Sequence, residues 1–99
     1  MKYLIWLSDV CASIKEVIEA LKTQDVETDL LLVQDGVYLV DKGCPQATEI
    51  SDLPVKVHAL KQHIEERGIG ERLVVDVNQV EYPEMIGLMM EEYDKIITL

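Results

Sequence analysis

Two runs of consecutive apolar residues constrain the fold of this chain more than any other feature. Residues 3–7 read Tyr-Leu-Ile-Trp-Leu, and residues 30–33 read Leu-Leu-Leu-Val. Each run has the length of a strand, and neither alternates between apolar and polar residues as a strand with one solvated side does. Strands that are apolar at every position are typical of parallel sheets covered by helices on both faces. The two runs therefore predict a buried parallel sheet.

Helical patterns alternate with the strands. Ser8 and Asp9 offer an N-cap for a helix whose apolar residues recur from Val10 to Leu21. The turn at 34–36 opens a short helix over 37–42, with Asp35 expected as its N-cap and Gly36 easing the turn. The later expected elements are a strand over 55–60, a helix over 61–67, a strand over 73–77, a helix over 84–92 and a strand over 96–99. This order predicts a single three-layer α/β domain over residues 1–99, with a mostly parallel sheet of four or five strands.

The chain is strongly acidic, with 19 aspartate and glutamate residues against 9 lysine and arginine residues and a formal net charge of −10. Such a surface repels phosphate backbones and anionic lipid, so neither direct nucleic-acid binding nor membrane binding is expected. The apolar run at 3–7 is too short for a signal sequence or a membrane span, which predicts a cytoplasmic protein. In that reducing compartment, a structural disulfide between the two cysteines is not expected.

The two cysteines are the candidate nucleophiles. Cys44 follows a helix-ending Gly43 and precedes Pro45, so we expect it in an exposed loop that a reaction partner can reach. Cys11 is expected in the first turn of the first helix, where the helix dipole favours a thiolate. It shares an apolar face with Ile14, however, and that position favours a buried, inert thiol. Cys44 is therefore the first candidate and Cys11 the second.

The other polar residues indicate no cofactor and no metal site. His58 lies in an expected strand and His63 on the following helix, without the spacing of metal ligands, so both are interpreted as packed or surface residues. The sequence Gly68-Ile69-Gly70 follows a helix and does not precede one, which does not fit a phosphate-binding loop.

Two helices are more apolar than contact with one sheet requires. Residues 37–40 are apolar on all sides, and the last helix carries a methionine-rich arc of about 200°. One interpretation is that both helices are deep core; the other is that they are adaptable subunit contacts. We favour the second interpretation and expect an oligomer. The expected contact residues are Val37, Tyr38, Val40, Met85, Met89 and Met90.

Three segments, in order, resemble the DsrH/TusB family. Residues 31–38 read Leu-Leu-Val-Gln-Asp-Gly-Val-Tyr, similar to the family's strand-to-helix turn LLLxQDGVY. Residues 57–68 resemble its segment VYALKxDLEARG. Glu81-Tyr82 and the helix that runs on to residues 94–96 resemble its closing segment, VDYxxFVxL. The likeness covers nearly the whole chain.

The resemblance implies a DsrEFH-like fold and a role in passing persulfide sulfur between proteins. TusB-like members assemble with TusC- and TusD-like (DsrE/DsrF-like) subunits and relay sulfur toward 2-thiolation of the tRNA wobble uridine. DsrH members take part in the corresponding assembly of sulfur-oxidising bacteria. The implied partners are such subunits or further copies of the chain itself.

One departure from the family pattern bears on the chemistry. Cysteine-bearing DsrH proteins carry their thiol inside the first helix, at a position that falls near Ala20 when counted back from Asp35, and neither cysteine lies there. No functional cysteine is carried over from the family. We therefore favour a structural or docking subunit without catalysis of its own. The alternative is a sulfur carrier or sulfurtransferase that holds a persulfide on Cys44 or Cys11.

Overall fold

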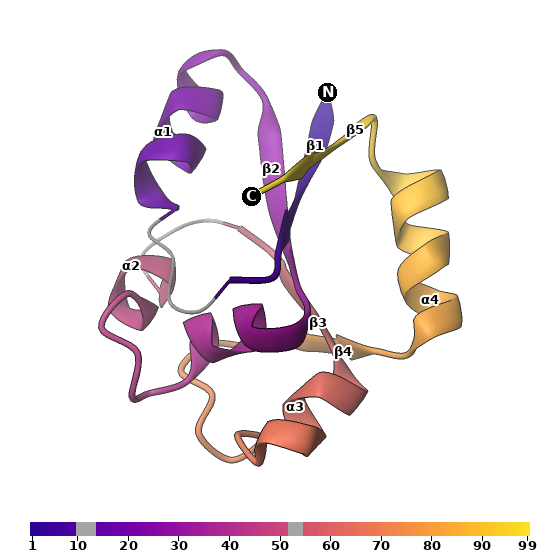
Figure 1. Ribbon diagram of the computed structural model, residues 1–99. Helices are drawn as coiled ribbons and strands as arrows, with labels where there is room; N and C mark the ends of the chain where they lie inside the picture. The colour runs from indigo at the N-terminus through magenta and orange to yellow at the C-terminus, as the bar shows by residue number, and fades with distance from the viewer. Residues whose placement is uncertain (10–13, 52–54) are drawn as a thin grey trace.

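The computed structural model describes residues 1–9, 14–51 and 55–99 and shows a five-stranded sheet with helices on both faces (Figure 1). The strands are β1 (Lys2–Leu7), β2 (Glu27–Leu32), β3 (Val57–Leu60), β4 (Asn78–Val80) and β5 (Lys95–Thr98). The α-helices are α1 (Lys15–Thr23), α2 (Ala47–Ser51), α3 (Lys61–Arg67) and α4 (Tyr82–Gly87). A 3-10 helix, η1 (Gln34–Val40), and a π-helix, η2 (Leu88–Glu92), complete the elements. Every strand pair is parallel, so the predicted three-layer α/β fold is confirmed.

The first four strands lie side by side in chain order, and the fifth strand lies on the opposite side of β1. The strand order of the sheet is β4-β3-β2-β1-β5, so the first four strands are added one after another toward one edge. The connection through α4 and η2 then crosses back and places β5 on the free side of β1. Because crossovers between parallel strands are right-handed, the returning helix covers the opposite face from α1, α2 and α3.

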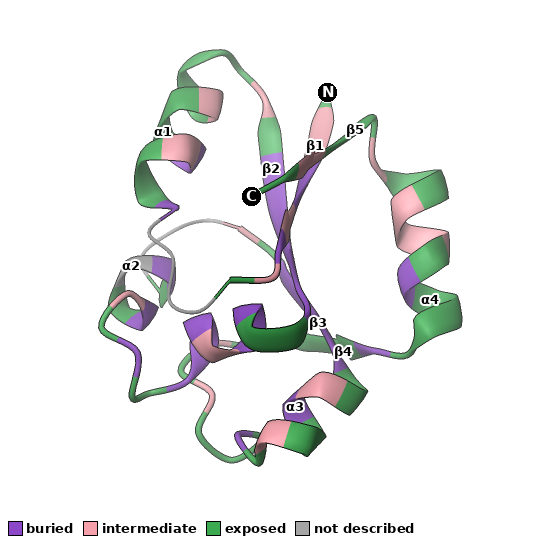
Figure 2. Ribbon diagram, viewed as in Figure 1, coloured by how far each residue is buried: buried purple, intermediate pink, exposed green. Residues whose placement is uncertain are grey.

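Each face of the sheet carries its own core, and both run along the central strands (Figure 2). The larger core lies under α1, η1, α2 and α3 and contains Ile5 and Leu30. The smaller core lies under α4 and η2 and contains Leu4 and Leu31. Successive residues of the two apolar runs in β1 and β2 therefore enter different cores, which explains why these runs do not alternate with polar residues.

The prediction of a strand over 73–77 is wrong. These residues form only an isolated bridge between Leu73 and Asp41, and the Val74 N–H donates to the Val40 carbonyl at 2.9 Å. Leu73, Val75 and Val77 pack partly buried against the larger core. The alternating apolar pattern reflects that packing, and β4 follows the segment.

The starts of α1 and β2 also differ from the predictions. α1 begins at Lys15 with Ile14 at its N-cap, not at Ser8-Asp9; residues 10–13 lie outside the described residues. β2 begins at Glu27, three residues before the apolar run, because Glu27 pairs with Lys2 of β1. Pairing with a neighbouring strand extends β2 through polar positions that the apolar pattern does not mark.

The predicted helix at 84–92 is confirmed and begins slightly earlier. A capping box joins Glu81 and Glu84, and Pro83 occupies the first turn, where its missing N–H costs nothing. In the parts of the chain that the structure describes, no helix combines the length and apolarity needed to cross a bilayer.

Candidate functional site

Cys44 lies in the turn between η1 and α2, and its thiol is buried. The residue is 5% exposed and belongs to the larger core. Its Sγ lies 3.5 Å from Oε1 of Gln46, and its N–H donates to the Asp41 carbonyl at 3.0 Å. The prediction that Cys44 is exposed is therefore wrong. The turn that brings η1 onto α2 folds the thiol inward, although Gly43 and Pro45 indicate a loop.

The Cys44 turn is fixed by Asp41. Its Oδ1 accepts a 2.7 Å hydrogen bond from Nε of Arg72, and its Oδ2 accepts a 3.0 Å bond from the Gly43 N–H. The bond from Arg72 lowers the pKa of the Asp41 carboxyl, more than burial raises it. The ionised side chain therefore stabilises the turn that covers the thiol.

Cys11, the second candidate nucleophile, lies outside the described residues. The chain leaves β1 at Leu7, and α1 starts at Lys15. The expected placement of Cys11 in the first turn of a helix stays a prediction. The carboxyl end of β1 lies between β2 and β5, where the strand order reverses.

The QDG turn works differently from its prediction. The N-cap of η1 is Val33, and Asp35 does not cap the helix; its Oδ1 instead accepts hydrogen bonds from Nε and Nη2 of Arg67 at 3.1 and 3.0 Å. Gly36 packs against β1, where an added Cβ would lie 2.1 Å from the Leu7 carbonyl oxygen. The glycine is therefore required by close approach of two backbones.

A group of polar contacts joins residues that follow the carboxyl ends of β2, β3 and β4. Gln34 adopts a left-handed conformation with φ 51°, and its N–H donates to Nδ1 of His63 at 2.7 Å. Nε2 of His63 lies 3.4 Å from the Tyr82 hydroxyl. A non-glycine residue with positive φ is uncommon, and here the bond to His63 supports it. No local sequence pattern indicates this group of contacts, because its members come from three separate segments.

A partly buried chain of polar side chains crosses the other end of the sheet. The Tyr93 hydroxyl donates to Oδ2 of Asp29 at 2.7 Å and lies 3.0 Å from Nε2 of His58. Nδ1 of His58 lies 2.9 Å from Nδ2 of Asn78. The pattern fits a neutral imidazole that accepts from Asn78 and donates to Tyr93. His58 is 5% exposed, which agrees with its interpretation as a packed residue.

Burial also shifts the pKa values of two members of this polar chain. It lowers the pKa of His58, against the opposing effect of the Asp29 charge. It raises the pKa of the Tyr93 hydroxyl well above its usual value, and the bond to Asp29 adds to the increase. Tyr93 therefore acts as a hydrogen-bond donor, and His58 is held uncharged.

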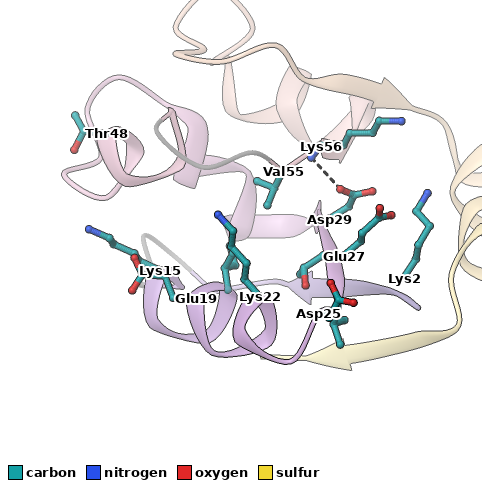
Figure 3. Close-up of a pocket in the computed structure, with 13 residues that line it drawn as sticks. Lys2, Lys15, Glu19, Lys22, Asp25, Glu27, Asp29, Thr48, Val55 and Lys56 are labelled. Carbon is teal, nitrogen blue, oxygen red and sulfur yellow. Dashed lines mark hydrogen bonds between the residues drawn. The ribbon is translucent and has the colours of Figure 1, made fainter.

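A cavity of about 1070 Å³ opens at the amino ends of β1 and β2, between α1 and residues 55–56 (Figure 3). Thr28 lines it, and its buried hydroxyl has no hydrogen-bond partner within the described part of the chain. The charged residues of the lining are the bases Lys2, Lys15, Lys22 and Lys56 and the acids Glu19, Asp25, Glu27 and Asp29. Because the two signs balance, the lining favours neither an anionic nor a cationic ligand. No group of His, Cys, Asp and Glu within residues 1–9, 14–51 and 55–99 is arranged to hold a metal ion.

The two apolar helices differ in what they expose. Val37 and Val40 are fully buried within the chain and Tyr38 is half-buried, so the expectation that η1 offers contact surface is wrong for its valines. The sheet, α2 and α3 pack against η1 and cover these two valines. In the last helix, Met85 is also buried, whereas Met89 is half-buried and Met90 is exposed. Of these two helices, the last one presents the larger apolar surface.

These features define a parallel α/β protein with a buried thiol at Cys44 and no exposed nucleophile among its described cysteines. Residues 8–95 match the family described as "DsrH like protein", and the chain belongs to that family. It is 37% identical to Protein TusB of Salmonella arizonae and of Salmonella newport over 62 residues, which is 63% of this chain. The match spans 65% of the length of those relatives.

The fold has a solved counterpart. The crystal structure of the ychN protein from E. coli superposes with a TM-score of 0.75 at 21% identity, covering 100% of both chains. This similarity confirms the predicted DsrEFH-like α/β fold. The family match likewise confirms the resemblance that the three sequence segments indicate.

Proposed function

We propose that this protein is a subunit of a cytoplasmic sulfur-relay assembly that docks to TusC- and TusD-like partners and carries no sulfur itself. Membership of the DsrH-like family and the likeness to TusB proteins support the relay role. The end product of the relay is 2-thiolated wobble uridine of tRNA. With a net charge of −10, the chain is poorly suited to hold the tRNA itself, so that contact falls to a partner.

The observation that carries the proposal is the burial of Cys44. A sulfur carrier must present a thiolate to an incoming persulfide, because the thiolate is the nucleophile in sulfur exchange. The Cys44 thiol is 5% exposed and faces Gln46, inside a turn fixed by Asp41 and Arg72. Reaching it would require local unfolding of this corner of the molecule.

A second candidate function is sulfur carriage on Cys11. Parallel α/β proteins bind ligands at the carboxyl edge where the strand order reverses, and β1, the strand that precedes Cys11 in the sequence, ends at that reversal. In such a step, the Cys11 thiolate attacks the outer sulfur of a donor persulfide. A new S–S bond forms on Cys11, and the donor leaves as its thiolate.

Intact mass spectrometry separates these functions. The chain is incubated with a small-molecule persulfide donor, alone and with TusC- and TusD-like subunits, as wild type, Cys44→Ser and Cys11→Ser. The docking role predicts a stable complex with those subunits and no one-sulfur adduct on either thiol. An adduct lost only in Cys11→Ser would establish the carrier function instead. A wild-type chain that stays monomeric by light scattering with every such subunit would refute the docking role.

A further inference from the structure

The last helix exposes an apolar row that nothing in the described chain covers. Tyr82 is 47% exposed, Ile86 is 51% exposed and Met90 is 78% exposed. They are spaced four residues apart, so they lie along one side of the α4–η2 helix. Met85, Leu88 and Met89 pack toward the smaller core. The row is therefore surface in addition to the face that holds the helix on the sheet.

The charged residues of the segment that carries this row all have one sign. Residues 81–94 contain no lysine or arginine, and their exposed carboxylates are those of Glu81, Glu84, Glu91, Glu92 and Asp94. A helix is about 10 Å across, and charges act over about 8 Å at physiological ionic strength, so a protein docked on the row meets this field. Lys2 offsets part of it at one end, where its Nζ lies 5.3 Å from the centre of the Tyr93 ring. At the other end, Lys61 lines a hollow with Glu81 and Tyr82, and its Nζ lies 3.9 Å from Oε1 of Glu65, so five carboxylates of the segment face two lysines. Lys95, by contrast, lies over Tyr3 on the other face of the sheet.

The charge decides what can cover the row. In a two-fold contact between copies of this chain, the same acidic segment would face itself, and like charges across an interface oppose binding. A partner with a basic rim gains from the same field. We infer that the α4–η2 face docks a different protein, whose contact face is apolar at its centre and rimmed by lysine and arginine. This inference rests on the proposed docking role and adds the surface and the chemistry of the partner.

A peptide titration tests the surface directly. The ¹⁵N-labelled full chain is titrated with two synthetic helical peptides that share one row of leucines, one flanked by lysines and the other by glutamates. The lysine peptide is expected to shift the resonances of residues 82–92 and to bind less tightly as salt rises, while the glutamate peptide does not bind there. Equal binding of both peptides, or shifts confined to other elements, would overturn the inference.

Matched variants sharpen the titration. Ile86→Ser combined with Met90→Ser is expected to weaken binding of the lysine peptide about tenfold, because a few apolar side chains at the centre of an interface supply most of its binding free energy. Val74→Ser is the control, since Val74 is an exposed apolar residue (39%) outside this helix. Glu91→Lys should also weaken binding, whereas Glu71→Lys, at an exposed site after α3, should not. Unchanged binding in the double variant would count against the row.

The same variants distinguish a failure of the inferred surface from a failure of the proposed docking role. If wild type assembles with TusC- or TusD-like subunits and the double variant assembles equally well, the inferred surface is wrong and the docking role stands. If wild type assembles with none of them, the docking role fails, and the peptide titration alone decides whether this face binds a basic partner.

Discussion

The Tyr93 hydroxyl donates a 2.7 Å hydrogen bond to Oδ2 of Asp29, and this contact ties the chain after η2 to β2. Asp29 is 9% exposed, and its other carboxylate oxygen accepts a 3.0 Å bond from the Lys56 N–H. Burying a carboxylate without partners is costly, so these bonds allow an acid to occupy a central strand. The contact also holds the end of the returning connection, whose helix presents the proposed docking row.

Tyr93→Phe should destabilise the protein by about 1–3 kcal/mol, because it leaves Asp29 and His58 each short of a buried hydrogen-bond partner. Urea unfolding followed by circular dichroism measures the change. Tyr82→Phe is the control: its hydroxyl is at the surface, 3.4 Å from His63, and its loss should cost at most about 0.5 kcal/mol. Equal effects of the two substitutions would contradict a structural role for the Tyr93 bond.

The stability of the protein should fall when the pH drops below about 6.5. Burial lowers the pKa of His58 in the folded state from the 6.5 of an unfolded chain, so the unfolded state binds its proton first. The contribution of uncharged His58 to the stability of the fold is therefore fully present above pH 6.5. It is lost as the pH falls from 6.5 toward the lowered pKa. Unfolding curves between pH 7.5 and 5 should show this slope in wild type, and His58→Gln should flatten it.

Asp41 titrates in a different window. Its pKa is lowered from 3.8, so its contribution is present above that value and is lost only under stronger acid. A wild-type slope between pH 7.5 and 5 that persists in His58→Gln would show that another group is responsible.

The parts of the fold that leave a dense local pattern could be predicted from sequence. Residues 3–7 of β1 and 30–32 of β2 lie between the two layers of helices, so these runs are apolar at every position. The QDG turn that follows β2 then resembles the family. β4 could not be found in this way. It consists of Asn78, Gln79 and Val80, and it is a strand because it pairs with β3, as in the register of Asn78 with His58. Tertiary pairing overrides weak local propensity at such an edge.

The site residues depended even more on long-range packing. Gly43 and Pro45 correctly indicate a turn around Cys44, yet whether the thiol faces solvent depends on α2 and on Arg72, which comes from a distant segment. The Asp29–Tyr93 bond joins residues 64 positions apart and has no local signature. Burial of a single side chain and polar contacts across the sheet are properties of the assembled fold.

Gly36→Ala should prevent folding or destabilise the protein by more than about 3 kcal/mol, because the backbone at the end of β1 and the backbone of η1 cannot easily move apart. The added Cβ would lie 2.1 Å from the Leu7 carbonyl oxygen and 2.8 Å from its carbon. Gly87→Ala is the matched control: it has open space around it in the last helix and should stabilise by about 0.5–1 kcal/mol. Thermal unfolding of both variants measures the difference. A well-folded Gly36→Ala with unchanged stability would contradict the close approach of β1 and η1.

Alkylation rates should report the burial of Cys44. In the Cys11→Ser variant, iodoacetamide should modify the folded protein at least about a hundred times more slowly than the same protein in urea, because the reagent reaches the thiol only through local opening. Arg72→Ala should increase the native rate, since Arg72 holds Asp41 and Asp41 holds the turn over the thiol. Lys42→Ala, a neighbouring exposed base, is the control and should leave the rate nearly unchanged. Modification as fast in the folded protein as in urea would place Cys44 at the surface and reopen sulfur carriage at that residue.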